Sequence, residues 1–248
     1  RPAVFLGNST STFDYVYQYD PLGWVSDIGY SPSNTAHFAN VFTAGSGLSA
    51  SGALKNAVAA EAVKAVSFYT PAANASYEIR IYTGVTGAPS TGTLAHGPQA
   101  GTLVAPGYYT IELDSEVPLT DGAKFAVAVK LTTPGYVYAI AIEEPAAGYS
   151  EKATANPGES FISSTGATWM DLTTVAGYEE ANVALKAFTG PYSGPTVTPT
   201  PTGTPTVTPT STPIPTPGPG SGGGGGCNAL GFAPLGLLFL IPFFVLKK

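Results

Sequence analysis

Over most of the first 190 residues, apolar and polar side chains alternate, which is the pattern of β-strands with one buried face. The alternation predicts strands over 63–69, 77–82, 107–113, 124–131, 135–142 and 182–188. Clusters rich in Gly and Pro separate these segments, as turns do. The Ala-rich stretch 53–65 lacks an apolar stripe and predicts at most a turn or two of helix. The pattern therefore predicts an all-β protein, an antiparallel β-sandwich of jelly-roll-like type.

The chain divides into parts of different composition. Residues 10–189 hold the tryptophans and nearly all tyrosines and charges, as a packed domain does, and 1–9 are expected to be the trailing edge of an upstream region. All 16 acidic residues and eight of the ten Lys and Arg residues precede Ala187, which gives this part a formal charge of −8. It lacks the basic surface that holds phosphates, so we expect no nucleic-acid partner.

The C-terminal part predicts a stalk and an anchor. Residues 190–221 form a Pro- and Thr-rich linker with two copies of PTVTPT, and proline favours an extended, semi-rigid spacer. Segment 222–248 opens with five glycines and Cys227, and its residues 229–246 are apolar. A helix rising about 1.5 Å per residue spans roughly 27 Å over that length, enough for a bilayer core. The two final lysines favour a cytoplasmic C-terminus, which would leave the acidic domain outside.

The layout of this segment, with GGGGGCN at 222–228, resembles bacterial C-terminal sorting signals of the PEP-CTERM and GlyGly-CTERM type, in particular the Synerg-CTERM signal. The resemblance implies a sorting protease that recognises the segment, and it implies lipid attachment at Cys227. The alternative is a permanent transmembrane helix with an incidental cysteine. Both interpretations place the protein at the bacterial cell envelope.

Residues for catalysis are scarce. The single cysteine, Cys227, lies beyond the linker, and the chain has no GxSxG, HExxH or Gly-rich phosphate motif. His37 and His96 have small or apolar neighbours and are expected to be structural or surface residues. Glu143 and Glu144 would point to opposite faces of a strand, so they make a poor glycosidase pair. The sequence therefore predicts a chain that is not an enzyme.

Two further groups of residues are candidates for binding. Asp14, Asp20 and Asp27 lie in an early loop-like segment and are weak candidate ligands of a structural calcium ion; the alternative is solvated loop carboxylates. Aromatic rings can stack on sugar rings, whereas packing in the core or at its edge is the alternative. The candidate sugar-binding rings are Trp24, Tyr30, Tyr136, Tyr138, Tyr149 and Trp169, and Tyr15, Tyr17 and Tyr19 would share one strand face.

The stretches 17–24 (YQYDPLGW) and 34–43 (NTAHFANVFT) are similar to the lectin-like domain that follows the catalytic domain in bacterial and archaeal papain-like cysteine peptidases. The similarity continues at 64–70, 130–135, 149–153, 157–161 and 184–188, and covers about 10–189. It implies a β-sandwich that binds carbohydrate or an extracellular partner, with the catalytic domain upstream of Arg1.

Three functions are compatible with these residues. The first is a non-catalytic, carbohydrate-binding module at the cell surface, accessory to a papain-like peptidase. The second is a structural or adhesive domain that docks on the peptidase without a sugar ligand. The third is a stand-alone hydrolase. Exposed rings on one sheet face favour the first, an apolar docking patch the second, and a cleft with two convergent carboxylates the third.

Overall fold

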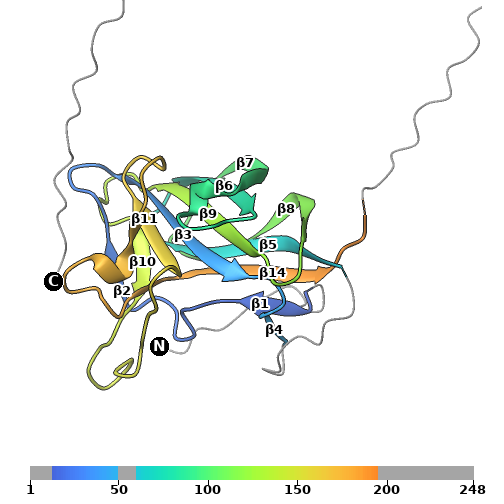
Figure 1. Cartoon of the computed structure of the whole chain (residues 1–248). Coiled ribbons are helices and arrows are strands. Elements are labelled where there is room, and N and C mark those ends of the chain that lie inside the picture. Colours follow the sequence, from blue (N-terminus) through green and yellow to red (C-terminus); the bar gives the residue numbers. More distant parts are fainter. Residues whose placement is uncertain (1–12, 50–59, 195–248) are drawn as a thin grey trace, which may run out of the picture. The chain divides into compact units, whose positions relative to one another are not determined.

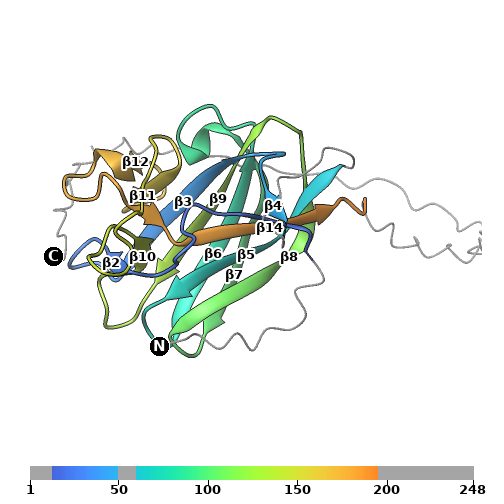
Figure 2. The ribbon, with the colours of Figure 1, turned by 90° about the horizontal axis from the view of Figure 1, so that it is seen from below.

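The computed structural model describes residues 13–49 and 60–194, in which regular structure is almost entirely antiparallel β-sheet (Figure 1). The all-β prediction is confirmed for this part of the chain. The first sheet has five strands in the order β4 (Leu48–Ser49), β1 (Tyr15–Tyr17), β14 (Leu185–Pro191), β5 (Glu61–Thr70) and β8 (Gly107–Leu119). Figure 2 shows β14 running beside β5 across this sheet.

The second sheet has six strands in the order β12 (Met170–Asp171), β11 (Ser160–Ser163), β3 (Thr35–Thr43), β9 (Lys124–Thr132), β6 (Ala75–Thr83) and β7 (Thr93–Leu103). A small third sheet joins β13 (Asn182–Val183), β10 (Ile140–Glu143) and β2 (Ser26–Ile28). The helical elements of the described part are two single-turn 3-10 helices, η2 (Pro89–Thr91) and η3 (Leu172–Thr174).

The core lies between the two large sheets. Every second side chain of their central strands points inward, and Phe38 of β3 meets Phe68 of β5 edge-on, with ring centroids 6.3 Å apart. Tyr17 of β1 bridges the layers in the same way through Phe125 of β9, at 5.2 Å. Each fully buried ring contributes about 1.5–3 kcal/mol through the area it removes from water.

The edges of the two sheets are joined by a side chain. Gln99 of β7 donates from Nε2 to the Glu112 carbonyl of β8 at 2.9 Å and accepts from the Asp114 N–H at 3.0 Å. His96 contacts Gln99 Oε1 at 2.8 Å and Ser115 Oγ at 3.1 Å. Backbone groups at the rim of β8 are therefore paired by side chains of the other sheet.

Some strand predictions were wrong in detail. Residues 135–142 were predicted as one strand, but β10 begins only at Ile140. Thr133 holds the preceding residues in a turn, because its carbonyl accepts from the Tyr136 N–H at 3.0 Å and its hydroxyl donates to the Tyr136 carbonyl at 2.7 Å. In the Ala-rich stretch, residues 61–65 belong to β5, and 53–59 lie outside the described residues.

Within 13–49 and 60–194, no helix is both long and apolar enough to span a bilayer. The predicted linker beyond Gly194, the segment with Cys227 and the apolar stretch 229–246 lie outside the described residues, as do residues 1–9.

Candidate functional site: a polar pocket on the six-stranded sheet

A pocket of about 550 Å³ opens on the outer face of the six-stranded sheet. Its base comes from rows of side chains across β3, β9 and β6. In one row His37 lies beside Lys130, and Lys130 lies beside Glu78. In the next row the central residue is Ala128, flanked by Ala39 and Arg80. Because the alanine side chain is short, the sheet surface is hollow at this point.

Charge in the pocket is organised around Glu78. Its Oε1 lies 2.7 Å from Lys130 Nζ, and its Oε2 lies 2.8 Å from Arg80 Nη2. The hydrogen bond from Lys130, followed by that from Arg80, lowers the pKa of Glu78 despite some desolvation, so the carboxylate is ionised at neutral pH. Partial burial, and then the charges of Lys130 and Arg80, lower the pKa of His37 to about 4. The imidazole is therefore neutral at pH 7 and can both donate and accept a hydrogen bond.

The loop after β11 forms a wall of the pocket next to His37. Ser163 Oγ accepts from the Thr165 N–H at 3.2 Å and from the Gly166 N–H at 2.8 Å, which fixes the turn. Gly166 has φ +76°, and a Cβ there would lie 2.6 Å from His37 Nδ1. Glycine is therefore required for this loop to approach the histidine.

Aromatic surface completes the pocket. Trp169 and Tyr82 line it, and both pack against a small apolar cluster on the outer face of the sheet. Trp169 Nε1 is buried and has no hydrogen-bond partner among the described residues. The accessible part of Trp169 is thus made of its ring carbons, which is the surface that stacks on apolar faces.

A second group of side chains, which we call the aromatic surface, consists of four rings and one leucine: Trp24, Tyr69, Tyr108, Tyr149 and Leu22. The Tyr69 ring centroid lies 5.8 Å from that of Trp24 and 4.7 Å from that of Tyr108. Leu22, Trp24 and Tyr149 are 46%, 36% and 64% exposed. Three large apolar side chains are thus in water around one turn of the chain.

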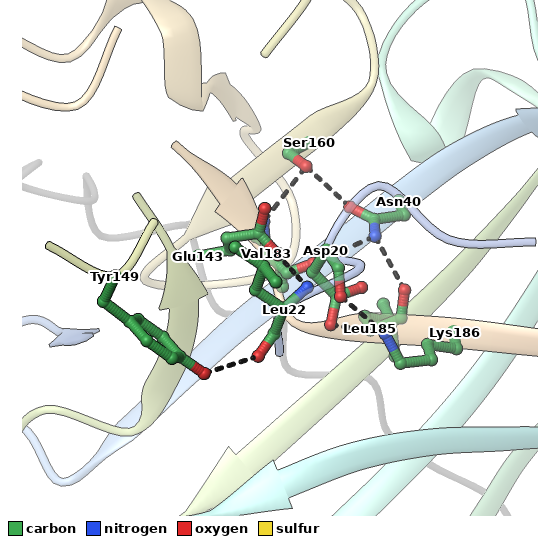
Figure 3. Close-up of polar contacts among 9 residues, drawn as sticks. All are labelled: Asp20, Leu22, Asn40, Glu143, Tyr149, Ser160, Val183, Leu185 and Lys186. Carbon is green, nitrogen blue, oxygen red and sulfur yellow. Dashed lines mark hydrogen bonds and ion pairs between the residues drawn. The ribbon is translucent and has the colours of Figure 1, made fainter. Parts of the chain in front are cut away.

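A buried polar cluster fixes that turn (Figure 3). Lys186 Nζ of β14 contacts Asp20 Oδ2 at 2.7 Å and the Asp20 carbonyl at 2.8 Å, while Glu143 Oε2 of β10 accepts from the Leu22 N–H at 2.7 Å. The Tyr149 hydroxyl reaches the Leu22 carbonyl at 3.4 Å. Burial is the main cause that raises the pKa of Asp20 to about 6, against the opposing effect of Lys186.

A second polar cluster in the same view joins the small sheet to the large ones. Asn40 Nδ2 donates to the Leu185 carbonyl at 2.8 Å and to the Val183 carbonyl at 3.2 Å, and Asn40 Oδ1 accepts from Ser160 Oγ at 2.8 Å. The Val183 N–H donates to Ser160 Oγ at 3.1 Å. The role of this cluster is structural, because its residues are buried and their polar groups form hydrogen bonds with one another.

The ring candidates from the sequence fall in separate places. Trp169 lies in the pocket and Trp24 and Tyr149 on the aromatic surface. Tyr30 is only 5% exposed and belongs to the core. Tyr136 and Tyr138 meet edge-on at 5.7 Å, neither is among the residues that line the pocket, and the Tyr136 hydroxyl donates to Asp27.

The predicted row of three rings along one strand does not form a sugar platform. The strand β1 ends at Tyr17, which is buried. Tyr17 and Tyr19 both pack on Phe42, with centroids 5.7 and 5.0 Å apart, and the Tyr19 hydroxyl donates to the Val41 carbonyl. These rings therefore belong to the inner side of the sandwich.

The three candidate calcium ligands have different surroundings. Asp14 is exposed, Asp20 pairs with Lys186, and Asp27 accepts from Tyr136. No three His, Cys, Asp or Glu side chains of residues 13–49 and 60–194 are grouped so that they could hold a metal ion. Cys227, the candidate for lipid attachment, is outside the described residues.

Sequence reasoning missed most of the pocket. The sequence predicted that His37 is a structural or surface residue. It predicted no binding role for Glu78, Arg80, Tyr82 or Lys130. The alternation over 77–82 does put Glu78, Arg80 and Tyr82 on one face, but any solvated strand has such a face. What identifies the site is the order β3-β9-β6, which the alternation does not give.

Comparison with known proteins agrees with the fold. The family model of the lectin-like domain matches residues 16–189, and the chain belongs to this family. No curated protein matches the chain.

The solved structures similar to this chain include two of the cysteine protease Cwp84. One is the clostridial cysteine protease Cwp84 after propeptide cleavage, with a TM-score of 0.56 and 26% identity over 73% of this chain. The other contains the cysteine protease and lectin-like domains of Cwp84, a surface layer associated protein of Clostridium difficile, with a TM-score of 0.50 and 26% identity over 64% of this chain. The match spans 41% and 33% of those chains.

Proposed function

We propose that this domain binds carbohydrate in the pocket on the six-stranded sheet and that it does so without catalysis. The observation that supports this most directly is the combination of aromatic, polar and charged side chains that line the pocket. A half-buried indole, a neutral imidazole and an ion-paired carboxylate line a hollow of about 550 Å³. Such pockets suit sugars, which present an apolar ring face and a rim of hydroxyls.

Each group has a defined role in this proposal. Trp169 stacks on the ring face of a sugar, and Tyr82 widens the apolar wall. Glu78 accepts from hydroxyls, while Arg80 and His37 donate to them. Among the residues that line the pocket, Glu78 is the single carboxylate, and it is held by two cations. Glycoside hydrolysis usually uses two carboxyl groups, so the lining favours binding over cleavage.

The test is a binding screen with the full chain, kept in a non-ionic detergent that contains no sugar. Immobilised polysaccharides and a glycan array identify ligands, and titration gives the dissociation constant. We expect Trp169→Ala to weaken binding about tenfold, because a stacking contact is lost. Trp24→Ala is the matched control, as it removes the other indole. Loss of binding on Trp24→Ala with retention on Trp169→Ala would move the site to the aromatic surface.

The same chain is proposed to act as an accessory module of a papain-like cysteine peptidase at the bacterial cell envelope. The similar structures support this, since one joins cysteine protease and lectin-like domains in a surface layer associated protein. The layout of 222–248 supports attachment through the C-terminus, either by processing by a sorting protease with lipid attachment at Cys227 or by a membrane helix over 229–246. Reading the gene upstream of Arg1 tests the association: a catalytic Cys, His and Asn set is expected there.

Docking on that peptidase domain is a second proposed function, and the aromatic surface favours it. Leu22 and Trp24 expose apolar area on a turn fixed by Asp20 and Glu143, and Tyr149 joins them from a separate turn through its hydroxyl, so the patch is held in place. We expect Trp24→Ala combined with Tyr149→Ala to weaken binding to the upstream peptidase region while sugar binding persists. Unchanged docking in this double variant would contradict the assignment.

A further inference from the structure

We infer that the pocket is selective for sugars that carry a negative charge, as a carboxylate or a phosphate; this rests on the proposed carbohydrate binding. The described residues include 16 Asp and Glu but only six Lys and Arg, a formal charge of −10. Two of those six cations, Arg80 and Lys130, line this pocket together with one acidic residue, Glu78. A local excess of positive charge inside a strongly acidic domain is a feature that a neutral ligand does not need.

The cations also have unused capacity for an anion. Arg80 and Lys130 each contact one oxygen of Glu78, at 2.8 and 2.7 Å. A guanidinium carries five N–H donors and an ammonium three, so most donors of both side chains remain for a ligand. Their side chains are 29% and 36% exposed, which leaves their heads accessible from the pocket. Arginine in particular matches carboxylate and phosphate oxygens in pairs.

The two cations and Trp169 line the same pocket. Lys130 lies in the same row as His37, and Arg80 lies one row further along, beside the hollow at Ala128. Trp169 lines the same cavity from the loop. A sugar stacked on Trp169 can therefore direct an acidic substituent towards Arg80 and Lys130 while its hydroxyls face His37.

Matched ligand pairs test the charge alone. Tri-galacturonate is compared with its fully methyl-esterified form, and mannose 6-phosphate with mannose, so that each pair shares its rings. Binding is followed by tryptophan fluorescence in the Trp24→Phe variant of the full chain, because the chain has two tryptophans and this leaves Trp169 as the reporter. We expect at least one charged form to bind about tenfold more tightly than its neutral partner, and the pair that shows this identifies the acidic group.

Single substitutions test which side chains cause the preference for the charged ligand. Lys130→Gln should weaken binding of the charged ligand about tenfold and leave its neutral partner within threefold. Arg80→Gln should also weaken binding of the charged ligand about tenfold, and binding of the neutral partner by a smaller factor, because Arg80 also donates to sugar hydroxyls. Glu78→Gln should strengthen binding of the charged ligand, because it removes the opposing charge. Lys124→Gln is the control: it removes the same charge from the other end of β9, six residues away and about 20 Å along the strand. Raising the salt concentration should narrow the difference within each pair.

The outcomes are distinguishable. Equal binding of charged and neutral partners overturns the charge selectivity and leaves carbohydrate binding intact. Tight binding of the charged ligand that survives Arg80→Gln combined with Lys130→Gln also overturns it. If no saccharide, charged or neutral, perturbs Trp169 or is retained in the polysaccharide screen, carbohydrate binding itself fails.

Discussion

The buried ion pair between Asp20 and Lys186 allows a quantitative test of how the turn 20–24 is held. Asp20 has no exposed area, and the Lys186 side chain is 12% exposed, so neither charge is screened by water. Removing one partner of a buried pair costs about 3–5 kcal/mol, since the remaining charge is left in a medium that solvates it poorly. We therefore expect Lys186→Met to lower the free energy of unfolding by about 3 kcal/mol.

The double variant separates charge from packing. Asp20→Asn with Lys186→Met removes both charges, and we expect it to recover most of the stability lost in Lys186→Met. Urea unfolding of the full chain, followed by circular dichroism and by tryptophan fluorescence, measures both quantities. A cost below about 1 kcal/mol for Lys186→Met, or equal costs for the single and double variants, would refute the reasoning.

The pH dependence of the same group has a definite sign. The pKa of Asp20 is about 6 in the folded state, above the value of about 4 for an unfolded chain. Between those values the folded state binds more protons, so the contribution of Asp20 to stability increases as pH falls through 6 towards 4 and is lost as pH rises. Two pKa units correspond to about 3 kcal/mol. The Asp20→Asn variant should lack this slope, and a slope identical to that of the parent chain would contradict the assignment.

Three further predictions concern other parts of the domain. Phe38→Ala should cost about 3–5 kcal/mol in urea unfolding because the ring is buried between the sheets, whereas Val104→Ala, at a position 79% exposed, should change stability by less than about 0.5 kcal/mol. Gly166→Ala should weaken ligand binding, measured by Trp169 fluorescence, because a Cβ at φ +76° would strike His37; unchanged affinity would contradict this. The pKa of His37 is about 4 when folded and about 6.5 when unfolded, so its contribution to stability should be lost as pH falls through that interval. The loss should be about 1–2 kcal/mol after allowing for solvent screening, and a His37→Gln variant that keeps the parent's pH profile would refute it.

The alternation of residues predicted the fold class because a strand with one buried face is a local property. Segments such as 124–131 and 182–188 overlap β9 and the strands β13 and β14 closely. The alternation failed at 135–139, where the Thr133 turn competes with a strand for the same backbone groups. Two long strands, β3 and β7, were not predicted. In β3 the buried Asn40 interrupts the apolar pattern, and in β7 most side chains are exposed, so the strand has no apolar face to recognise.

The candidate site was predictable only in part, because it depends on strand order. Trp169 could be selected as a large ring in a polar sequence, but its partners come from three strands that are distant in sequence. Similarly, Asp20 was suggested as a calcium ligand from its loop-like neighbours. Its partner Lys186 lies 166 residues away, and only the tertiary fold shows that an ammonium group occupies that position.

The bridge made by Gln99 has a consequence for behaviour at high local concentration. An exposed strand edge can template pairing with another molecule, which leads to aggregation. Here the long edge strands β7 and β8 are tied together by Gln99 and His96, and the opposite edges of the two large sheets, β4 and β12, are two residues long. Within the described part of the chain, the Glu112 carbonyl and the Asp114 N–H of β8 are thus already paired and cannot pair with a neighbour's strand. At this point of the edge, a strand of a second copy would have to displace Gln99 before it could extend the sheet.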